Sequence, residues 1–110
     1  MATDLGDRVM IDVERFDLDK DQPIFHGLVD LDPTELKEID KEKWRQVAQQ
    51  IIGLENMPKR LIESFADQNL DGVPQLGSTG AMAGSLVTYV VRQISCGYDL
   101  PSGRYIVDPI

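Results

Sequence analysis

The chain has 110 residues, 19 acidic and 11 basic side chains and a formal net charge of −8, the size and composition of one small soluble domain. The acidic balance argues against direct binding of nucleic acid, because phosphate contacts need a basic face. No apolar run approaches the length of a membrane-spanning helix, and the N-terminus lacks the basic start and apolar stretch of a secretory signal, so we expect no membrane partner.

The net charge is concentrated at one end of the chain. Residues 1–42 hold 13 Asp and Glu against 5 Lys and Arg, which gives −8, whereas residues 43–110 hold 6 of each. An acidic surface favours cations or a basic protein surface, and it accelerates encounter with such a partner by electrostatic steering. The alternative is that the charge serves solubility alone.

A single cysteine, Cys96, excludes an intramolecular disulfide. This fits a reducing compartment, and we expect a cytoplasmic protein.

The acidic N-terminal region, residues 1–31, is predicted to contain strands and loops. Residues 8–16 begin apolar and then alternate, which favours a strand over the competing short amphipathic helix. Residues 17–23 are rich in Asp and end in Pro23, which indicates a loop. Residues 24–29 are predicted as a second strand that forms a hairpin with the first.

A long helix is predicted from Asp32 to about Gly53. Asp32 is a suitable N-cap, Pro33 fits the first helical position, and Glu35 completes the spacing of a capping box. An apolar stripe at three- to four-residue spacing predicts the buried face of this helix, and it includes Trp44. Its members are Leu36, Ile39, Trp44, Val47, Ala48, Ile51 and Ile52.

Two further helices complete the predicted helical region, residues 32–96. The second begins near residues 56–58, buries Leu61, Ile62 and Phe65, and ends by residues 71–72. Residues 73–77 break regular structure. For residues 79–95, spacing favours a helix begun by Ser78, although the β-branched residues there also suit a buried strand.

The remaining segment, residues 97–110, is predicted as a turn followed by a short strand over 104–107, which Pro109 terminates. Together these elements predict an α+β fold in one globular domain, residues 1–110. It is dominated by three helices, with a short N-terminal hairpin and a C-terminal strand that pairs with it.

One motif resembles half of a calcium site. Asp67, Asn69 and Asp71 occupy the first three ligand positions of an EF-hand loop, followed by the Gly72 that such a loop needs. Ser78 stands where the loop requires a bidentate Glu, so the resemblance implies weak calcium binding at most. The alternative is an ordinary helix-ending turn, and we expect no obligatory cofactor.

Residues 77–81 suggest an anion site, because small residues before a helix expose backbone N–H groups. The alternative is a helix N-terminus with small residues chosen for packing.

The function favoured by the sequence is a non-catalytic interaction module, an adaptor or inhibitor, that presents an acidic face to a basic protein. Acting as a nucleic-acid mimic is one form of this hypothesis. On a continuous helix, Glu35, Glu38 and Glu42 would follow one side. The candidate partner-binding residues are Asp12, Glu14, Asp17, Asp19, Asp21, Asp30, Glu35, Glu38 and Glu42. A calcium-binding helix–loop–helix protein and a small anion-binding domain are the alternatives, and the oligomeric state stays open.

Overall fold

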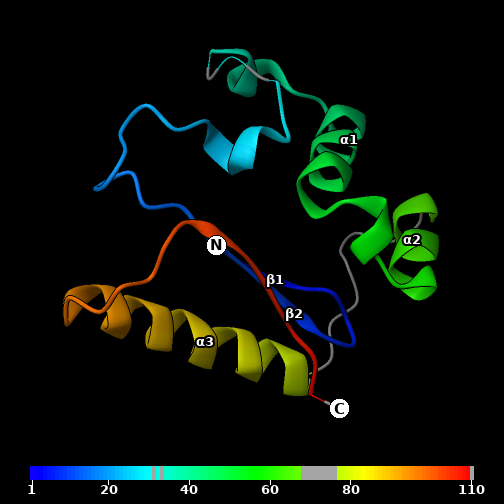
Figure 1. The fold of residues 1–110 in the computed structure, drawn as a ribbon. Coiled ribbons are helices and arrows are strands. Elements are labelled where there is room, and N and C mark those ends of the chain that lie inside the picture. The colour runs from blue at the N-terminus through cyan, green and yellow to red at the C-terminus, as the bar shows by residue number, and fades with distance from the viewer. Residues whose placement is uncertain (31, 33, 68–76, 110) are drawn as a thin grey trace.

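The computed structural model describes residues 1–30, 32, 34–67 and 77–109. Over these residues it contains a three-stranded antiparallel sheet, three α-helices and three short 3-10 helices (Figure 1). The strands are β1 (Ala2–Asp4), β2 (Val9–Val13) and β3 (Gly103–Val107), in spatial order β1-β2-β3. The helices are α1 (Lys41–Ile52), α2 (Lys59–Ala66) and α3 (Gly77–Ser95). The predicted α+β fold in one small domain is confirmed.

The central strand, β2, lies within residues 8–16 as predicted, and it pairs with the C-terminal strand β3. Its hairpin partner is β1, which the sequence analysis missed. The connecting turn is fixed by Gly6 at φ 94°, whose N–H donates to Asp4 Oδ1 at 2.8 Å. The predicted strand at residues 24–29 is wrong. This segment forms the 3-10 helix η1 (Ile24–Gly27), in which Phe25 and His26 both have positive φ.

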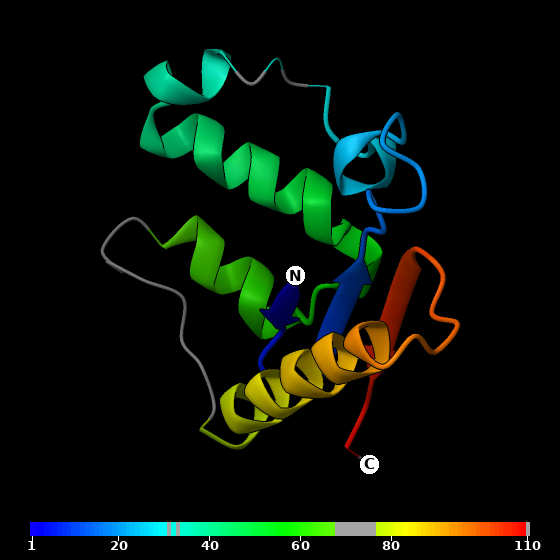
Figure 2. The same cartoon turned by 90° about the vertical axis from the view of Figure 1, so that its left-hand side faces the viewer.

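Alternation along β2 places apolar side chains on both faces of the sheet. Val9, Ile11 and Val13 are buried on the face covered by α3, where Leu86 and Val90 pack against them. Met10 faces the other side and is fully buried with residues from the helical region and the β1–β2 turn. Figure 2 shows α3 crossing under the sheet, with α1 and α2 on the opposite side. Because α3 spans Gly77–Ser95, the helix predicted at residues 79–95 is confirmed.

The long helix predicted from Asp32 is interrupted. The Asp32 carboxylate accepts hydrogen bonds from Thr34, and the 3-10 helix η2 (Glu35–Glu38) follows. Ile39 is extended at ψ 124°, and the real N-cap of α1 is Asp40, whose Oδ1 accepts from the Lys43 N–H at 2.8 Å. Two Asp residues eight positions apart therefore compete as caps, and the second begins the α-helix. The end at Gly53, with φ 84°, is confirmed.

Helix α2 ends at Ala66, several residues before its predicted end, and is preceded by the 3-10 helix η3 (Leu54–Asn56). Leu61 is buried as predicted, beside Met57 and Ile52. Ile62 is 40% exposed, so its predicted burial is wrong. The break predicted at residues 73–77 falls mostly outside the described residues, except that Gly77 already belongs to α3.

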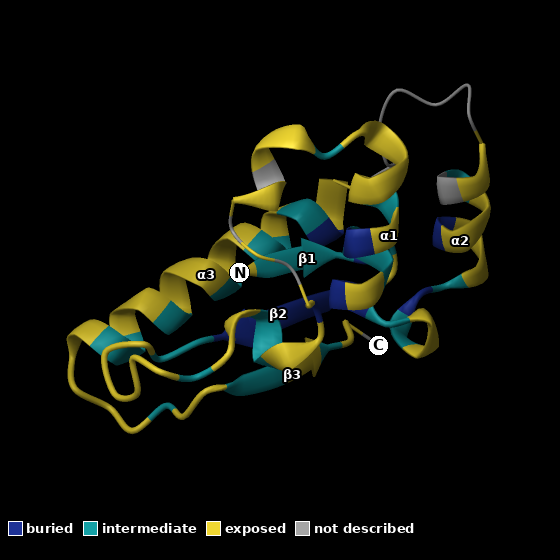
Figure 3. Ribbon diagram, turned by 90° about the horizontal axis from the view of Figure 1, so that it is seen from above, coloured by how far each residue is buried: buried dark blue, intermediate teal, exposed yellow. Residues whose placement is uncertain are grey.

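The fold leaves much apolar surface uncovered. Most of the long helix α3 is exposed or only partly buried (Figure 3), and Val87, Tyr89 and Val91 are among its exposed residues. Trp44, predicted to be core, is 50% exposed, because the first turn of α1 extends beyond the elements that cover its later turns. The chain exposes 7593 Å², whereas folded monomers of this mass expose about 6,100 Å². No helix in the described part of the chain is both long and apolar enough to cross a membrane.

Candidate functional site: an acidic front around a buried ion cluster

Asp12 is buried and ion-paired, contrary to its predicted place on an exposed acidic face. Its side chain is 2% exposed and accepts from Arg104 of β3, at 2.8 Å from Nε to Oδ1 and 3.3 Å from Nη2 to Oδ2. Arg104 also donates to the carbonyls of Ile51 and Ile52 at the end of α1. A guanidinium with a planar fork suits this arrangement, since it donates to a buried carboxylate and to two carbonyls at the helix end together.

His26 completes this cluster from η1. Its Nε2 lies 3.1 Å from Asp12 Oδ1, and its side chain is 24% exposed. The backbone at Phe25 and His26 has φ 48° and 54°, a region that non-glycine residues seldom adopt. The cluster of Asp12, Arg104 and His26 thus joins β2, β3, η1 and the end of α1. Because its carboxylate is already occupied by Arg104 and His26, we interpret it as the device that positions the acidic segment over the sheet.

The acids of residues 17–23 are exposed but partly engaged within their own loop. Arg15 donates to Asp17 at 2.7 Å, and this hydrogen bond lowers the pKa of the Asp17 carboxyl below its ordinary value. Asp19 Oδ1 accepts from the N–H of Asp21 at 3.0 Å. Asp21 and Asp19 remain open to a partner, whereas Asp17 is already offset by an arginine.

Four predicted acids lie on the surface without an ion pair to any described residue: Asp30, Glu35, Glu38 and Glu42. The interruption at Ile39 separates Glu35 and Glu38 on η2 from Glu42 on α1, so the expected stripe along one continuous helix is wrong. In Figure 1 the segment that carries them lies on the side of the sheet opposite α3. We call Asp19, Asp21, Asp30, Glu35, Glu38 and Glu42 the acidic front.

Glu14 lies at the margin of this surface and is only partly exposed. Its Oε1 atom is buried and has no hydrogen-bond partner among the described residues, and the same holds for the Nε2 atom of Gln22. A carboxylate held in this way contributes less surface potential than the six acids of the front.

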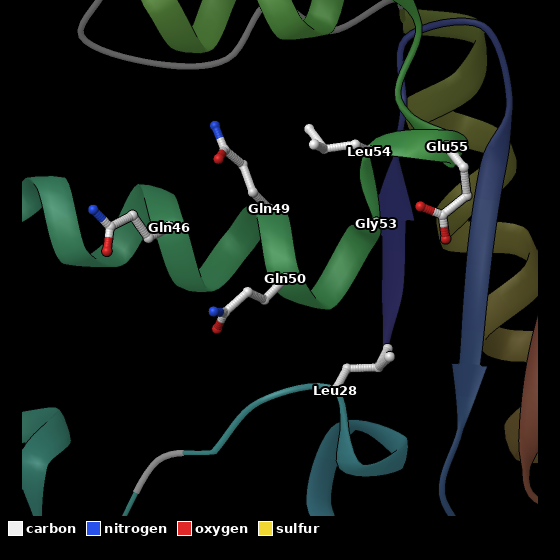
Figure 4. A pocket seen from close by; sticks show the side chains of 7 residues that line it. All are labelled: Leu28, Gln46, Gln49, Gln50, Gly53, Leu54 and Glu55. Carbon is white, nitrogen blue, oxygen red and sulfur yellow. The ribbon is translucent and has the colours of Figure 1, made fainter.

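A shallow pocket of about 540 Å³ adjoins the front beside α1 (Figure 4). Its lining comprises three amide side chains, one carboxylate, two leucines and a glycine: Leu28, Gln46, Gln49, Gln50, Gly53, Leu54 and Glu55. Gln46 follows Glu42 by one helical turn, so the polar face of α1 runs from the front into the pocket. Amide oxygens and a carboxylate beside leucine side chains suit a long basic side chain with an aliphatic stem.

The described residues contain no cluster of metal-binding side chains. Of the candidate calcium ligands, Asp67 lies at the end of α2, while Asn69 and Asp71 fall outside the described residues.

At the candidate anion site, residues 77–81, a carboxylate of the chain itself contacts the first turn of α3. Asp4 Oδ2 accepts from Thr79 Oγ1 at 3.0 Å in the first turn of α3. A carboxylate here interacts favourably with the positive end of the helix, and binding of a free anion at these residues stays a prediction.

Sequence reasoning missed Arg104, Trp44 and the glutamines of α1. Arg104 lies in a short strand with no sequence-local partner, and Asp12 is 92 residues away. The recurrence of Gln46, Gln49 and Gln50 opposite the apolar stripe of α1 was the available signal for a polar helix face.

No family model and no solved structure matches the chain. The uncharacterized protein MT1398 of Mycobacterium tuberculosis (strain CDC 1551 / Oshkosh) is 38% identical over 112 residues, which cover 98% of this chain and 15% of that protein. The chain therefore spans about one seventh of the length of this curated relative. The relative's name specifies no activity.

Proposed function

We propose that this chain is a non-catalytic interaction module whose acidic front docks a basic protein surface. The observation that carries the proposal is the separation of charge: residues 1–42 hold the whole net charge of −8, and residues 43–110 are neutral. Complementary potentials of this kind steer association and set specificity between protein partners.

The geometry supports the proposal by leaving the front available. Asp7, Asp12 and Asp17 are offset by Arg8, Arg104 and Arg15. The six acids of the front have no such ion pair among the described residues, and all are exposed. They supply most of the unpaired negative charge on the surface of this half, to which the exposed capping residues Asp32 and Asp40 add.

Two neighbouring features supply contacts beyond charge. The pocket beside α1 offers amide and carboxylate oxygens to a Lys or Arg side chain. Trp44, half-exposed in the first turn of α1, offers an aromatic ring, and tryptophan and arginine are enriched among the residues that dominate binding energy.

The experiment is capture of partners from native lysate at low salt, with elution by rising salt. The immobilised baits are the wild type, Glu35→Lys/Glu38→Lys/Glu42→Lys and Lys41→Glu. We expect a basic protein that elutes as salt rises, weaker retention on the triple variant and stronger retention on Lys41→Glu, because Lys41 adjoins the same acids.

Retention that is equal on all three baits, or indifferent to salt, would overturn the proposal. Circular dichroism of each bait checks that the substitutions leave the fold intact. Adding duplex DNA to the captured complex tests the nucleic-acid-mimic hypothesis. If DNA displaces the partner, the front and DNA compete for the same surface of that partner. The proposal places this encounter in the cytoplasm.

A further inference from the structure

The outer edge of β3 carries backbone groups with no partner among the described residues. The direction of each backbone group follows from the β1–β2 pairing. Met1 and Asp12 exchange two hydrogen bonds, of 2.7 and 2.8 Å, and the Leu5 N–H donates to the Arg8 carbonyl at 3.0 Å. Backbone groups of the even-numbered residues of β2 therefore point toward β1, because successive residues of a strand alternate in direction.

The odd-numbered residues of β2 must then bond to β3. Val9, Ile11 and Val13 lie opposite Val107, Tyr105 and Gly103. It follows that the N–H and C=O groups of Arg104 and Ile106 point away from β2, toward the open edge. Figure 2 shows β3 at the margin of the sheet, with no helix or strand of the described chain beyond it.

Edge strands are commonly protected by charged side chains, proline or a bulge. In β3 the charge of Arg104 is turned inward to Asp12, and Pro109 lies beyond the strand. Tyr105 and Ile106, on opposite faces of the strand, are 40% and 44% exposed. The middle of this edge is thus uncharged on its surface, apolar and open to pairing.

We infer that β3 pairs antiparallel with β3 of a second copy of this chain, about a two-fold axis at Tyr105. This register places Arg104 opposite Ile106 of the partner subunit, so that all outward N–H and C=O groups of the two residues meet. Tyr105 faces Tyr105 of the partner subunit in a non-hydrogen-bonded pair, the closer of the two antiparallel arrangements. The two sheets become one sheet of six strands.

Three observations favour a second copy as the occupant. The outward N–H and C=O groups of one β3 match those of a second β3 about a two-fold axis, as a symmetric contact between two copies requires. Within β3 the only charged side chain is Arg104, and Asp12 of the same chain offsets it, so the paired strands bring no unpaired charge together. The chain also exposes roughly 1,500 Å² more than expected for its mass, against about 800 Å² per subunit in a standard interface.

Sedimentation equilibrium of the full chain, from low micromolar to near-millimolar concentration, tests the inference. We expect a monomer–dimer equilibrium with an observed mass that rises toward twice that of the chain. A monomer at every concentration overturns the inference and leaves the edge to a foreign strand, and so does a dimer that the variants below do not weaken.

The decisive variant is Ile106→Pro, which removes the outward N–H while the bonds of β3 to β2 use its neighbours. Two hydrogen bonds disappear per dimer, so dimerisation should weaken roughly 10- to 30-fold. Ile106→Lys tests the same edge without a backbone change, because it places a charge on the otherwise uncharged middle of the edge. Leu54→Lys, the same kind of change at a 61% exposed leucine away from β3, should leave the dimer intact.

A cross-link tests the register. In a Cys96→Ser background, Tyr105→Cys places two thiols opposite each other across the two-fold axis, and mild oxidation should give a disulfide-linked dimer. Val107→Cys is the matched control, because its counterpart in this register is Gly103 of the partner subunit. Equal cross-linking at both positions, or cross-linking at 107 alone, overturns the proposed pairing.

Discussion

The acidic N-terminal region supplies much of the buried core, whereas the neutral, apolar C-terminal region is mostly exposed, the opposite of what their compositions suggest. Residues 1–42 carry all the net charge, yet they supply the buried strand β2 together with Leu5 and Val29. Residues 77–109 are apolar and neutral, yet Thr79 is the only residue among them classed as buried. Position in the sheet decides burial here: β2 has neighbours on both edges and both faces, while α3 and β3 each have one side open.

The largest expected effect comes from breaking the bond between the two regions. Asp12→Ala should destabilise the fold by about 4 kcal/mol, because it leaves Arg104 mostly enclosed without its carboxylate. Urea unfolding followed by circular dichroism measures the change. Replacing both partners with Asp12→Leu/Arg104→Met should recover much of the loss, and a loss for the pair equal to the sum of the single losses would argue against their coupling.

The next largest effect compares the loss of stability from truncating an apolar side chain in each of the two regions. Met10→Ala should cost about 3 kcal/mol, since Met10 is fully buried and a cavity remains. Val91→Ala on α3 should cost about 0.5 kcal/mol or less, because this side chain is 56% exposed. Equal losses in urea unfolding would show that the apolar end is as buried as the front.

A smaller effect is expected at Trp44, the single tryptophan. Because it is half-exposed, Trp44→Ala should cost about 1 kcal/mol, well below the roughly 3–5 kcal/mol of a core tryptophan. Its fluorescence should be quenched by iodide and should shift to shorter wavelength when a partner covers α1. An emission that resists iodide in the free chain would contradict the exposure.

The smallest effect concerns Asp17, whose carboxyl pKa is lowered by the hydrogen bond from Arg15. A lowered pKa stabilises the fold above the ordinary pKa of Asp, and this contribution is lost as the pH falls through the lowered value. Asp17→Asn should therefore be slightly less stable than the wild type at neutral pH, and the difference should vanish in acid. Thermal unfolding across this pH range measures it, and a difference that grows in acid would contradict the assigned sign.

Local patterns in the sequence predicted the elements whose causes are local. Alternation found β2, periodicity found α3, and the glycine after Ile52 marked the end of α1. The missed hairpin strand β1 has only three residues, too few for a pattern. The premature start of α1 arose because Asp32 and Asp40 are equally good caps by residue type, and only the extended backbone at Ile39 separates them.

The candidate site was less predictable, because its geometry depends on distant pairings. Surface acids such as Glu38 and Glu42 are recognisable from a charged stretch, but Asp12 looks the same in sequence and is buried. Asp12 can be buried because Arg104 pairs with it, and the two residues are brought together only by the register of β2 and β3. Exposure of Trp44 and Val91 was likewise invisible, since periodicity identifies the apolar face of a helix and not whether anything covers it.

The pairing of Val9 with Val107 has a consequence for the order in which this protein folds during synthesis. A ribosome releases β1, β2 and the helices α1, α2 and α3 before β3, so the hairpin forms with one edge of β2 unpaired and Asp12 without its arginine. Closing a loop of this length is slow compared with forming helices and hairpins. Insertion of β3 is therefore expected to follow the formation of the hairpin and these helices, and a stalled chain that lacks β3 would offer β2 itself to misassembly.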